Sequence, residues 1–255
     1  MTQTRGTNTV QATRTSLAVL ETLKRLDGAG VTRVAEELGI PKSTTHNHLQ
    51  TLVDEGYVVA DGDGYRPSLR FLEFGEATRH RLSVYGTAEP EVRRLAEETG
   101  ELANLAVEER GWGVYLARAS GSDAVRVDVL AGTHVHLHAT ALGKAILAHL
   151  PDGRVDEIVE RRGLPEQTEG TITDRAALDE ELAAVRERGY AFDRGERLPG
   201  IRCVAAPVID PQGRVLAALS VSGPATRMQG DRFHEEIPEL LESAANVVEI
   251  NVTYA

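Results

Sequence analysis

Short polar side chains gather at the start of a segment, residues 42–55, whose apolar residues recur with helical spacing. Its first turns carry Lys42, Ser43, Thr44, His46 and Asn47. Such side chains at the amino end of a helix can reach base edges and phosphates in the DNA major groove. Asparagine pairs with adenine, while lysine, serine and the N–H groups of a helix start bind phosphate. The alternatives are a solvated polar face of a small helical domain, or a helix-turn-helix that contacts proteins.

A second set of polar residues lies in the last half of the chain. Ser220 and Ser222 alternate on one expected strand, so both hydroxyls point to the same face. Cys203 lies on the neighbouring strand, and Asp193 follows in a loop after residues 190–192. The set favours a pocket for a small hydroxy- or oxo-acid, such as a sugar acid, with aromatic acids as second choice. Alternatively, the two serines and Cys203 are buried strand residues with local hydrogen bonds.

Backbone N–H groups supply a further anion contact. Thr140 is expected to cap a helix over residues 141–150, and unpaired N–H groups at such a start attract a carboxylate. A phosphate-binding loop ending in Gly143 and Lys144 is excluded, because it requires glycine at the position of His138.

Metal binding and nucleophilic catalysis are weaker interpretations. His134, His136 and His138 alternate and could line a strand face, but no carboxylate or cysteine is close in sequence. Cys203 could be a nucleophile with a histidine base, although a cysteine within a strand is more often a small core residue. We therefore expect no enzyme activity, no metal and no cofactor.

The polar helix is the third of three helices expected within residues 15–67. Thr15 or Ser16 would cap the first, a short helix over 32–38 follows, and residues 39–41 form a tight turn. The inward residues are expected to be Leu17, Leu20, Leu23 and Leu26 in the first helix and Thr45, Leu49, Leu52 and Val53 in the third. Residues 57–67 read as a β-hairpin around a Gly/Asp turn, with Arg66 placed to touch a flanking minor groove or backbone. This order is typical of a winged helix-turn-helix domain.

The remaining chain predicts a linker helix and one larger domain. Residues 1–14 are expected to be a flexible tail, residues 68–82 the linker helix, and residues 83–255 an α/β domain. The expected strands cover residues 102–107, 113–117, 125–129, 201–209 and 214–221. One helix is expected to begin at Pro90, and four more are expected over residues 141–150, 155–161, 175–188 and 231–252.

Composition places the chain among cytoplasmic proteins. Its 255 residues include one cysteine, so no intramolecular disulfide forms, and neither a signal peptide nor a membrane-spanning run is expected. The net charge of −11 is uneven, because residues 1–80 carry 9 basic and 10 acidic side chains, a net of −1. The near-neutral first third keeps nucleic-acid binding possible. The acidity, with few lysines and only 4% aromatic residues, favours a host with a salty cytoplasm.

Two separate motif groups resemble the IclR family of transcriptional regulators. The first comprises residues 15–20, 34–44 and 49–52, and the second comprises residues 138–148, 200–208 and 217–224. The resemblance covers about residues 12–250. It implies an α+β protein with an N-terminal winged helix-turn-helix, a linker helix and a C-terminal GAF-like α/β effector-binding domain, acting as a homodimer or tetramer.

The resemblance also implies site residues and a function. The family's ligand-contacting positions correspond to Ala141, Leu142, Asp193, Cys203, Ser220 and Ser222, and its apolar wall to Ala124, Val127 and Val135. We expect a regulator that binds a double-stranded DNA operator of two symmetric half-sites, with its affinity tuned by a small organic acid. The alternative is a GAF-like sensor or enzyme whose N-terminal domain mediates protein contacts.

Overall fold

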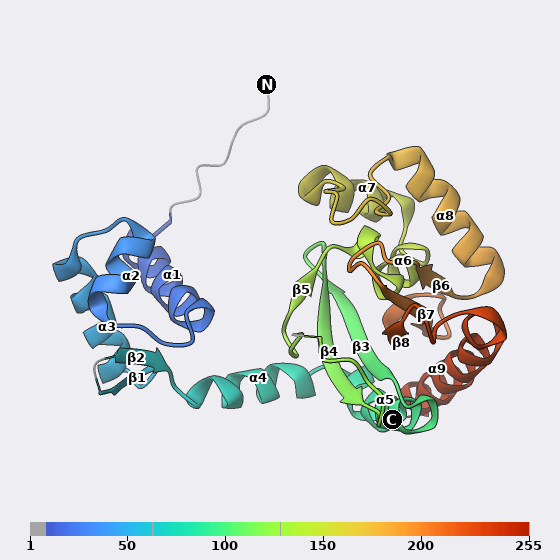
Figure 1. Ribbon diagram of the computed structural model, residues 1–255, viewed down its shortest axis with the longest axis horizontal. Helices are drawn as coiled ribbons and strands as arrows, with labels where there is room; N and C mark the ends of the chain where they lie inside the picture. Colours follow the sequence, from blue (N-terminus) through green and yellow to red (C-terminus); the bar gives the residue numbers. More distant parts are fainter. Residues whose placement is uncertain (1–8, 63, 128, 255) are drawn as a thin grey trace. The chain divides into compact units, whose positions relative to one another are not determined.

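A computed structural model describes residues 9–62, 64–127 and 129–254 of the chain (Figure 1). The chain divides into two compact units between Thr78 and Arg79. The first unit contains helices α1 (Gln11–Arg25), α2 (Val31–Leu38) and α3 (Lys42–Asp54), followed by strands β1 (Val58–Asp61) and β2 (Gly64–Pro67). This order confirms the expected winged helix-turn-helix.

The first unit has its own small apolar core. Val19 and Leu23 of α1, Val34 of α2, and Leu49 and Leu52 of α3 are buried against one another. Gly39 ends α2 in the left-handed region at φ 64°, where glycine has no steric penalty, so the chain turns sharply into α3. The β-hairpin is held to the α1–α2 loop by a reciprocal pair of backbone hydrogen bonds between Ala29 and Tyr65.

The first helix differs from its expected form. It begins at Gln11, so neither Thr15 nor Ser16 is its cap, and the Thr15 hydroxyl instead donates to the Gln11 carbonyl. Leu17 was expected inward but is 56% exposed, because the buried stripe runs through Val19 and Leu23 instead. Residues 11–14 of the expected tail are thus helical, and residues 1–8 lie outside the described residues.

The division between the units falls within α4 (Arg70–His80), the expected linker helix. Its start is fixed to the hairpin, since the Arg70 guanidinium lies over the Tyr57 ring at 4.6 Å and Phe71 contacts the same ring. None of the α4 residues is buried. Its apolar side chains, with Leu69 just before it, therefore remain exposed.

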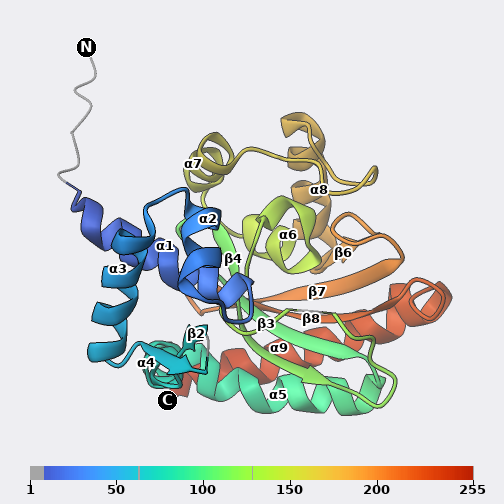
Figure 2. The same cartoon turned by 60° about the vertical axis from the view of Figure 1, so that its left-hand side comes forward.

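The second unit is a six-stranded antiparallel sheet with helices on both faces (Figure 2). The strand order is β5-β4-β3-β8-β7-β6. The strands are β3 (Leu102–Glu109), β4 (Trp112–Ser120), β5 (His134–Val135), β6 (Ala191–Asp193), β7 (Ile201–Ile209) and β8 (Val215–Pro224). The helices are α5 (Ser83–Thr99), α6 (Ala141–Leu147), α7 (Asp152–Arg162), α8 (Arg175–Arg188) and α9 (Ile237–Tyr254), the last preceded by a π-helical turn (Arg232–Glu236).

Alternating side chains divide the sheet between two cores. In β8, Leu219 and Val221 face α5 and α9, whereas Ala218 faces the side covered by α6, α7 and α8. Ser220 and Ser222 share the face of Ala218, since the side-chain period of a strand is two. Polar residues on this face therefore lie beneath α6, in the interior of the domain.

Four expectations for this unit were wrong in detail. Pro90 does not start a helix but lies inside α5, where it costs one backbone hydrogen bond in a well-buried helix. Of the strand expected over residues 125–129, Asp128 lies outside the described residues and the others form no strand. Asp193 ends strand β6 rather than lying in a loop, and α6 stops at Leu147. The α+β class and the two-domain organisation are confirmed. In the described ranges we find no helix with the length and apolar character needed to cross a membrane.

Candidate functional site

The first candidate site is the outward face of α3. Thr45, Leu49 and Leu52 are buried, so the opposite face turns to solvent. Exposed there are Lys42, Ser43, His46 and Asn47, with Thr44 half-buried. The leading residues of the helix therefore do not pack into the protein interior, which is the geometry that reading a DNA groove requires.

The start of α3 also offers backbone donors. Its N-cap residue is Pro41, which makes no side-chain capping hydrogen bond, so this residue leaves the N–H groups of the first turn uncapped. The positive end of the helix dipole and these N–H groups suit a DNA phosphate. Farther along α3, the ring of His48 is hydrogen-bonded to the Ser16 hydroxyl at 2.9 Å, which fixes α3 against α1.

Arg66 lies on the hairpin, as predicted, and is exposed. Its Nε atom is 3.2 Å from an oxygen of Asp61, a side chain that is also exposed. An exposed ion pair of this kind contributes about 0–1 kcal/mol, so a phosphate could readily replace the aspartate.

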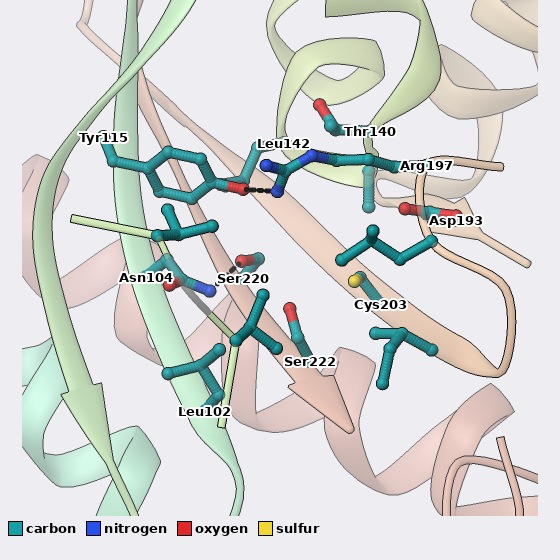
Figure 3. Close-up of a pocket in the computed structure, with 15 residues that line it drawn as sticks. Leu102, Asn104, Tyr115, Thr140, Leu142, Asp193, Arg197, Cys203, Ser220 and Ser222 are labelled. Carbon is teal, nitrogen blue, oxygen red and sulfur yellow. Dashed lines mark hydrogen bonds between the residues drawn. The ribbon is translucent and has the colours of Figure 1, made fainter. Parts of the chain in front are cut away.

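The second candidate site is a cavity between the sheet and α6 (Figure 3). It encloses about 480 Å³ of empty space, part of which opens to solvent. A cavity of this size suits a small molecule. Its lining residues are Leu102, Asn104, Tyr115, Val127, Val129, Thr140, Ala141, Leu142, Asp193, Arg197, Leu198, Ile201, Cys203, Ser220 and Ser222.

Strand register explains how the polar lining comes together. Ser222 pairs with Cys203 of β7, and Ser220 pairs with Asn104 of β3, so all four side chains share one face of three adjacent strands. The Asn104 amide donates to the Ser220 hydroxyl at 3.2 Å. The alternative that these are buried strand residues with local hydrogen bonds therefore holds in part for Ser220, because its hydroxyl already has a hydrogen-bond partner in the protein.

Asp193 and Tyr115 are two buried titratable groups of the cavity wall. Burial, with the nearby Glu196 carboxylate, raises the pKa of Asp193 to about 6. Its Oδ1 atom accepts hydrogen bonds from the backbone N–H groups of Gly195 and Glu196. Burial likewise raises the pKa of Tyr115 to about 12, so its phenol remains protonated at neutral pH.

The environment of Cys203 argues against nucleophilic catalysis. Burial, with the Asp193 carboxylate, raises the pKa of the Cys203 thiol, so the sulfur is not the thiolate that such chemistry requires. No group of three histidine, cysteine or carboxylate side chains in the described ranges is arranged to hold a metal ion. Instead, His138 donates to the Pro165 carbonyl and His134 to that of Gly132.

A buried ion pair fixes the loop that closes one side of the cavity. Lys144 of α6 is 1% exposed, and its ammonium lies 2.6 and 2.7 Å from the two carboxylate oxygens of Glu196. The Glu196 carbonyl also accepts hydrogen bonds from the Thr168 and Thr171 hydroxyls. The β6–β7 loop, residues 194–200, is thus held in one conformation directly before Arg197.

Seven of the nine expected effector residues line the cavity, but Ala124 and Val135 do not. The structure places Val135 in the apolar core under α6, and Ala124 follows the turn beside Gly121, so among the described lining residues only Val127 comes from the expected apolar wall. Asn104, Tyr115 and Arg197 were missed. Asn104 and Tyr115 could have been found, because each is a residue with a polar group inside an otherwise apolar strand. No periodic pattern in the sequence marks Arg197.

The start of α6 was expected to attract a carboxylate through its N–H groups. The Thr140 hydroxyl already accepts the Gly143 N–H at 2.9 Å, and Thr140, Ala141 and Leu142 line the cavity. The helix is only seven residues long, so its dipole is a weak source of positive potential.

Comparison with known proteins now identifies the two units. The model of the IclR helix-turn-helix domain matches residues 14–62, and that of the bacterial transcriptional regulator IclR C-terminal domain matches residues 76–249. The HTH-type transcriptional regulator BhcR of Paracoccus denitrificans is 35% identical over 92% of this chain and 85% of its own length. The probable HTH-type transcriptional regulator ArcR of Halobacterium salinarum is 32% identical over 94% of this chain and 93% of its own.

A solved structure supports the same assignment. An IclR homolog from Microbacterium hydrocarbonoxydans, complexed with 4-hydroxybenzoate, superposes with a TM-score of 0.82 at 26% identity, covering 96% of this chain and all of that one. Both family models, in the expected order, together with relatives that match nearly end to end, show that the chain belongs to the IclR family of transcriptional regulators, DNA-binding proteins with a C-terminal effector-binding domain.

Proposed function

We propose that α3 is the helix that reads the operator. The observation that carries this proposal is the separation of its two faces, with Thr45, Leu49 and Leu52 buried and the leading polar residues exposed. Asn47 and His46 would contact base edges, and Lys42, Ser43 and Thr44 would contact bases or phosphates. Arg66 would contact the backbone or minor groove beside the hairpin.

We further propose that the regulator acts in the cytoplasm as a homodimer or tetramer on two symmetric half-sites. Support comes from the apolar side chains around the start of α4, because Leu69, just before the helix, is 76% exposed and Leu72, within it, is 64% exposed. A second copy of the chain would remove this surface from water. A monomer in light scattering at micromolar concentration would contradict the oligomer.

The effector is a small organic acid bound by the polar lining of the cavity. Asp193, Ser220 and Ser222 would bind its hydroxyl or oxo groups, Cys203, Ala141 and Leu142 would complete the contact, and Val127 would provide apolar contact. The effector favours one pose of the oligomer, and α4 carries the difference to the spacing of the reading helices. Only an effector with unequal affinity for the two poses can act in this way. Ala124 and Val135 are not part of this proposed site.

A gel-shift titration tests the DNA assignment. The probe is DNA from upstream of the protein's own gene, at fixed low salt, because phosphate contacts weaken steeply with salt. Lys42→Ala with Asn47→Ala should weaken sequence-specific binding by about 10-fold or more, since a base contact contributes about 1–3 kcal/mol. Lys24→Ala, which removes an exposed lysine from α1, serves as the charge-matched control. Unchanged binding by the double variant would show that α3 is not the reading element.

The same assay tests the cavity. Ser220→Ala with Ser222→Ala should blunt the response of the DNA complex to added organic acid, while Ser122→Ala, an exposed serine outside the lining, should respond as the parent does. A full response from the double variant would remove the serines from the effector site.

A further inference from the structure

Among the described residues, one cation of the cavity has no anionic partner. Arg197 lines the cavity from the β6–β7 loop and is half-buried. Its Nη1 atom donates to the Tyr115 hydroxyl at 3.1 Å, and its guanidinium lies 5.8 Å from the centre of the Tyr115 ring. The side chain therefore reaches across the cavity from the loop to β4 (Figure 3).

Several other arginines of this unit are paired with carboxylates. Arg227 makes a two-point contact with Glu101 at 2.7 and 2.8 Å, Arg188 lies 2.8 Å from Glu181, and Arg154 lies 2.6 Å from Glu108. Within the described part of the chain, no carboxylate oxygen lies within 4 Å of Arg197. A partly desolvated cation that faces a cavity and contacts only a neutral phenol is a site for an incoming anion.

The loop holds this guanidinium in place before any ligand arrives. Glu196 is bound by Lys144 through its side chain and by Thr168 and Thr171 through its carbonyl, so the residue directly before Arg197 is fixed at three points. Its own backbone N–H donates to Asp193 at 2.7 Å. A cation that is positioned in advance loses little conformational entropy when it binds.

The two charged residues of the lining have different neighbours. Arg197 contacts a phenol, whereas Asp193 accepts two backbone hydrogen bonds from its own loop. An anion would be attracted to the arginine and would avoid the aspartate. The lining thus gives a ligand a defined direction, with its charged end at the Arg197–Tyr115 contact and its polar remainder toward Asn104, Ser220 and Ser222.

We propose that Arg197 is the specificity-determining residue of the cavity, selecting a small monocarboxylate by a direct guanidinium–carboxylate contact. A planar guanidinium offers paired N–H donors that match the two oxygens of a carboxylate. The Tyr115 phenol, while accepting from Arg197, still has a proton to donate to the same carboxylate. This inference rests on the proposed function of the cavity as the effector site. It adds that Arg197 is the residue by which the cavity distinguishes acids from their neutral analogues.

Calorimetric titration of the full chain tests the inference with matched ligand pairs. The probes are 4-hydroxybenzoate with 4-hydroxybenzamide and pyruvate with pyruvamide, each pair differing in the charge of one group. The wild-type chain should bind at least one acid about 10- to 100-fold more tightly than its amide. Arg197→Met should bring that ratio to within about 3-fold, mainly by weakening the binding of the acid, while Arg197→Lys should retain an intermediate ratio.

Arg194→Met is the matched control. Arg194 lies in the same loop, but it is exposed and stacks on Phe192 at 4.5 Å rather than lining the cavity. This variant should keep the parent ratio. Urea unfolding followed by fluorescence of Trp112 confirms that each variant is folded.

Three results would overturn the proposal. They are equal binding of acid and amide by the wild-type chain, an undiminished ratio in Arg197→Met, and no binding of either acid up to about 10 mM. The ratio of acid to amide affinity is measured without DNA, so its result does not depend on whether the protein regulates an operator. A chain that selects acids through Arg197 but ignores them on its operator would refute the regulatory proposal alone.

Discussion

Removing the Lys144 ammonium should destabilise the effector-binding unit strongly. The Lys144 side chain is 1% exposed, and its partner Glu196 is 6% exposed. A carboxylate oxygen of Glu181 lies 3.5 Å from the same ammonium. Lys144→Met keeps most of the volume but leaves a buried carboxylate without its cation. Breaking one partner of a buried pair costs about 3–5 kcal/mol. Because about 1 kcal/mol shifts the Tm of a unit of this size by about 2–4 °C, we expect Tm to fall by about 6–20 °C.

The assay uses a reporter that the chain already contains. Trp112 is the single tryptophan and lies at the start of β4, so its fluorescence during urea unfolding follows the effector-binding unit. Glu196→Gln should cost less than Lys144→Met, about 1–3 kcal/mol, since Lys144 keeps Glu181 as a partner. Lys24→Met, an exposed lysine of α1, should leave this transition unchanged.

A double variant decides whether the pair is the cause. Lys144→Met with Glu196→Gln should cost less than the sum of the two single changes, because neither charge is then left buried alone. The reasoning is refuted if the free energy of unfolding of Lys144→Met lies within about 1 kcal/mol of the parent value, with the same dependence on urea concentration. It is also refuted if the costs of the two single changes simply add in the double variant.

Two further changes test the packing and the electrostatics of the cavity wall. Gly143→Ala should destabilise the same transition by about 3 kcal/mol or more, since its Cβ would lie 2.0 Å from the Leu137 carbonyl oxygen. Gly153→Ala in α7, which meets nothing within 4 Å, should be neutral or stabilising, and equal costs would contradict the close approach. The raised pKa of Asp193 means that the folded state holds this proton more tightly than the unfolded state, so stability falls as pH rises from about 4 to about 6. Asp193→Asn should remove up to about 3 kcal/mol of this pH-dependent loss of stability. Parallel profiles of stability against pH for parent and variant would show that the pKa of Asp193 is not raised in the folded state.

Much of the fold could be predicted because it follows local periodicity. The third helix was placed within one residue of α3, and residues 175–188 and 201–209 match α8 and β7. The errors arose where tertiary packing overrides a local signal. Pro90 is a good helix start on its own, yet burial of Val92 and Leu95 carries α5 through it.

The candidate sites divide in the same way. Alternation on β8 placed Ser220 and Ser222 on one face, and the strand register then brought Cys203 opposite Ser222. Arg197 could not be found by such reasoning, because its position depends on a loop that Lys144 fixes from outside through Glu196, 52 residues later in the chain. The missing information is long-range pairing, which no local pattern contains.

Separate cores for the two units have an evolutionary consequence. Within the ranges that the structure describes, the core around Val19, Leu23 and Leu49 contains no residue beyond the hairpin, and the lining residues of the cavity all follow Thr99. Under the proposed assignment of the cavity as the effector site, substitutions at Arg197 or Tyr115 would alter which metabolite is sensed without disturbing the side chains that hold α3. A lineage could in this way inherit one set of target genes and place it under a new chemical signal by a few changes in the wall of a single cavity.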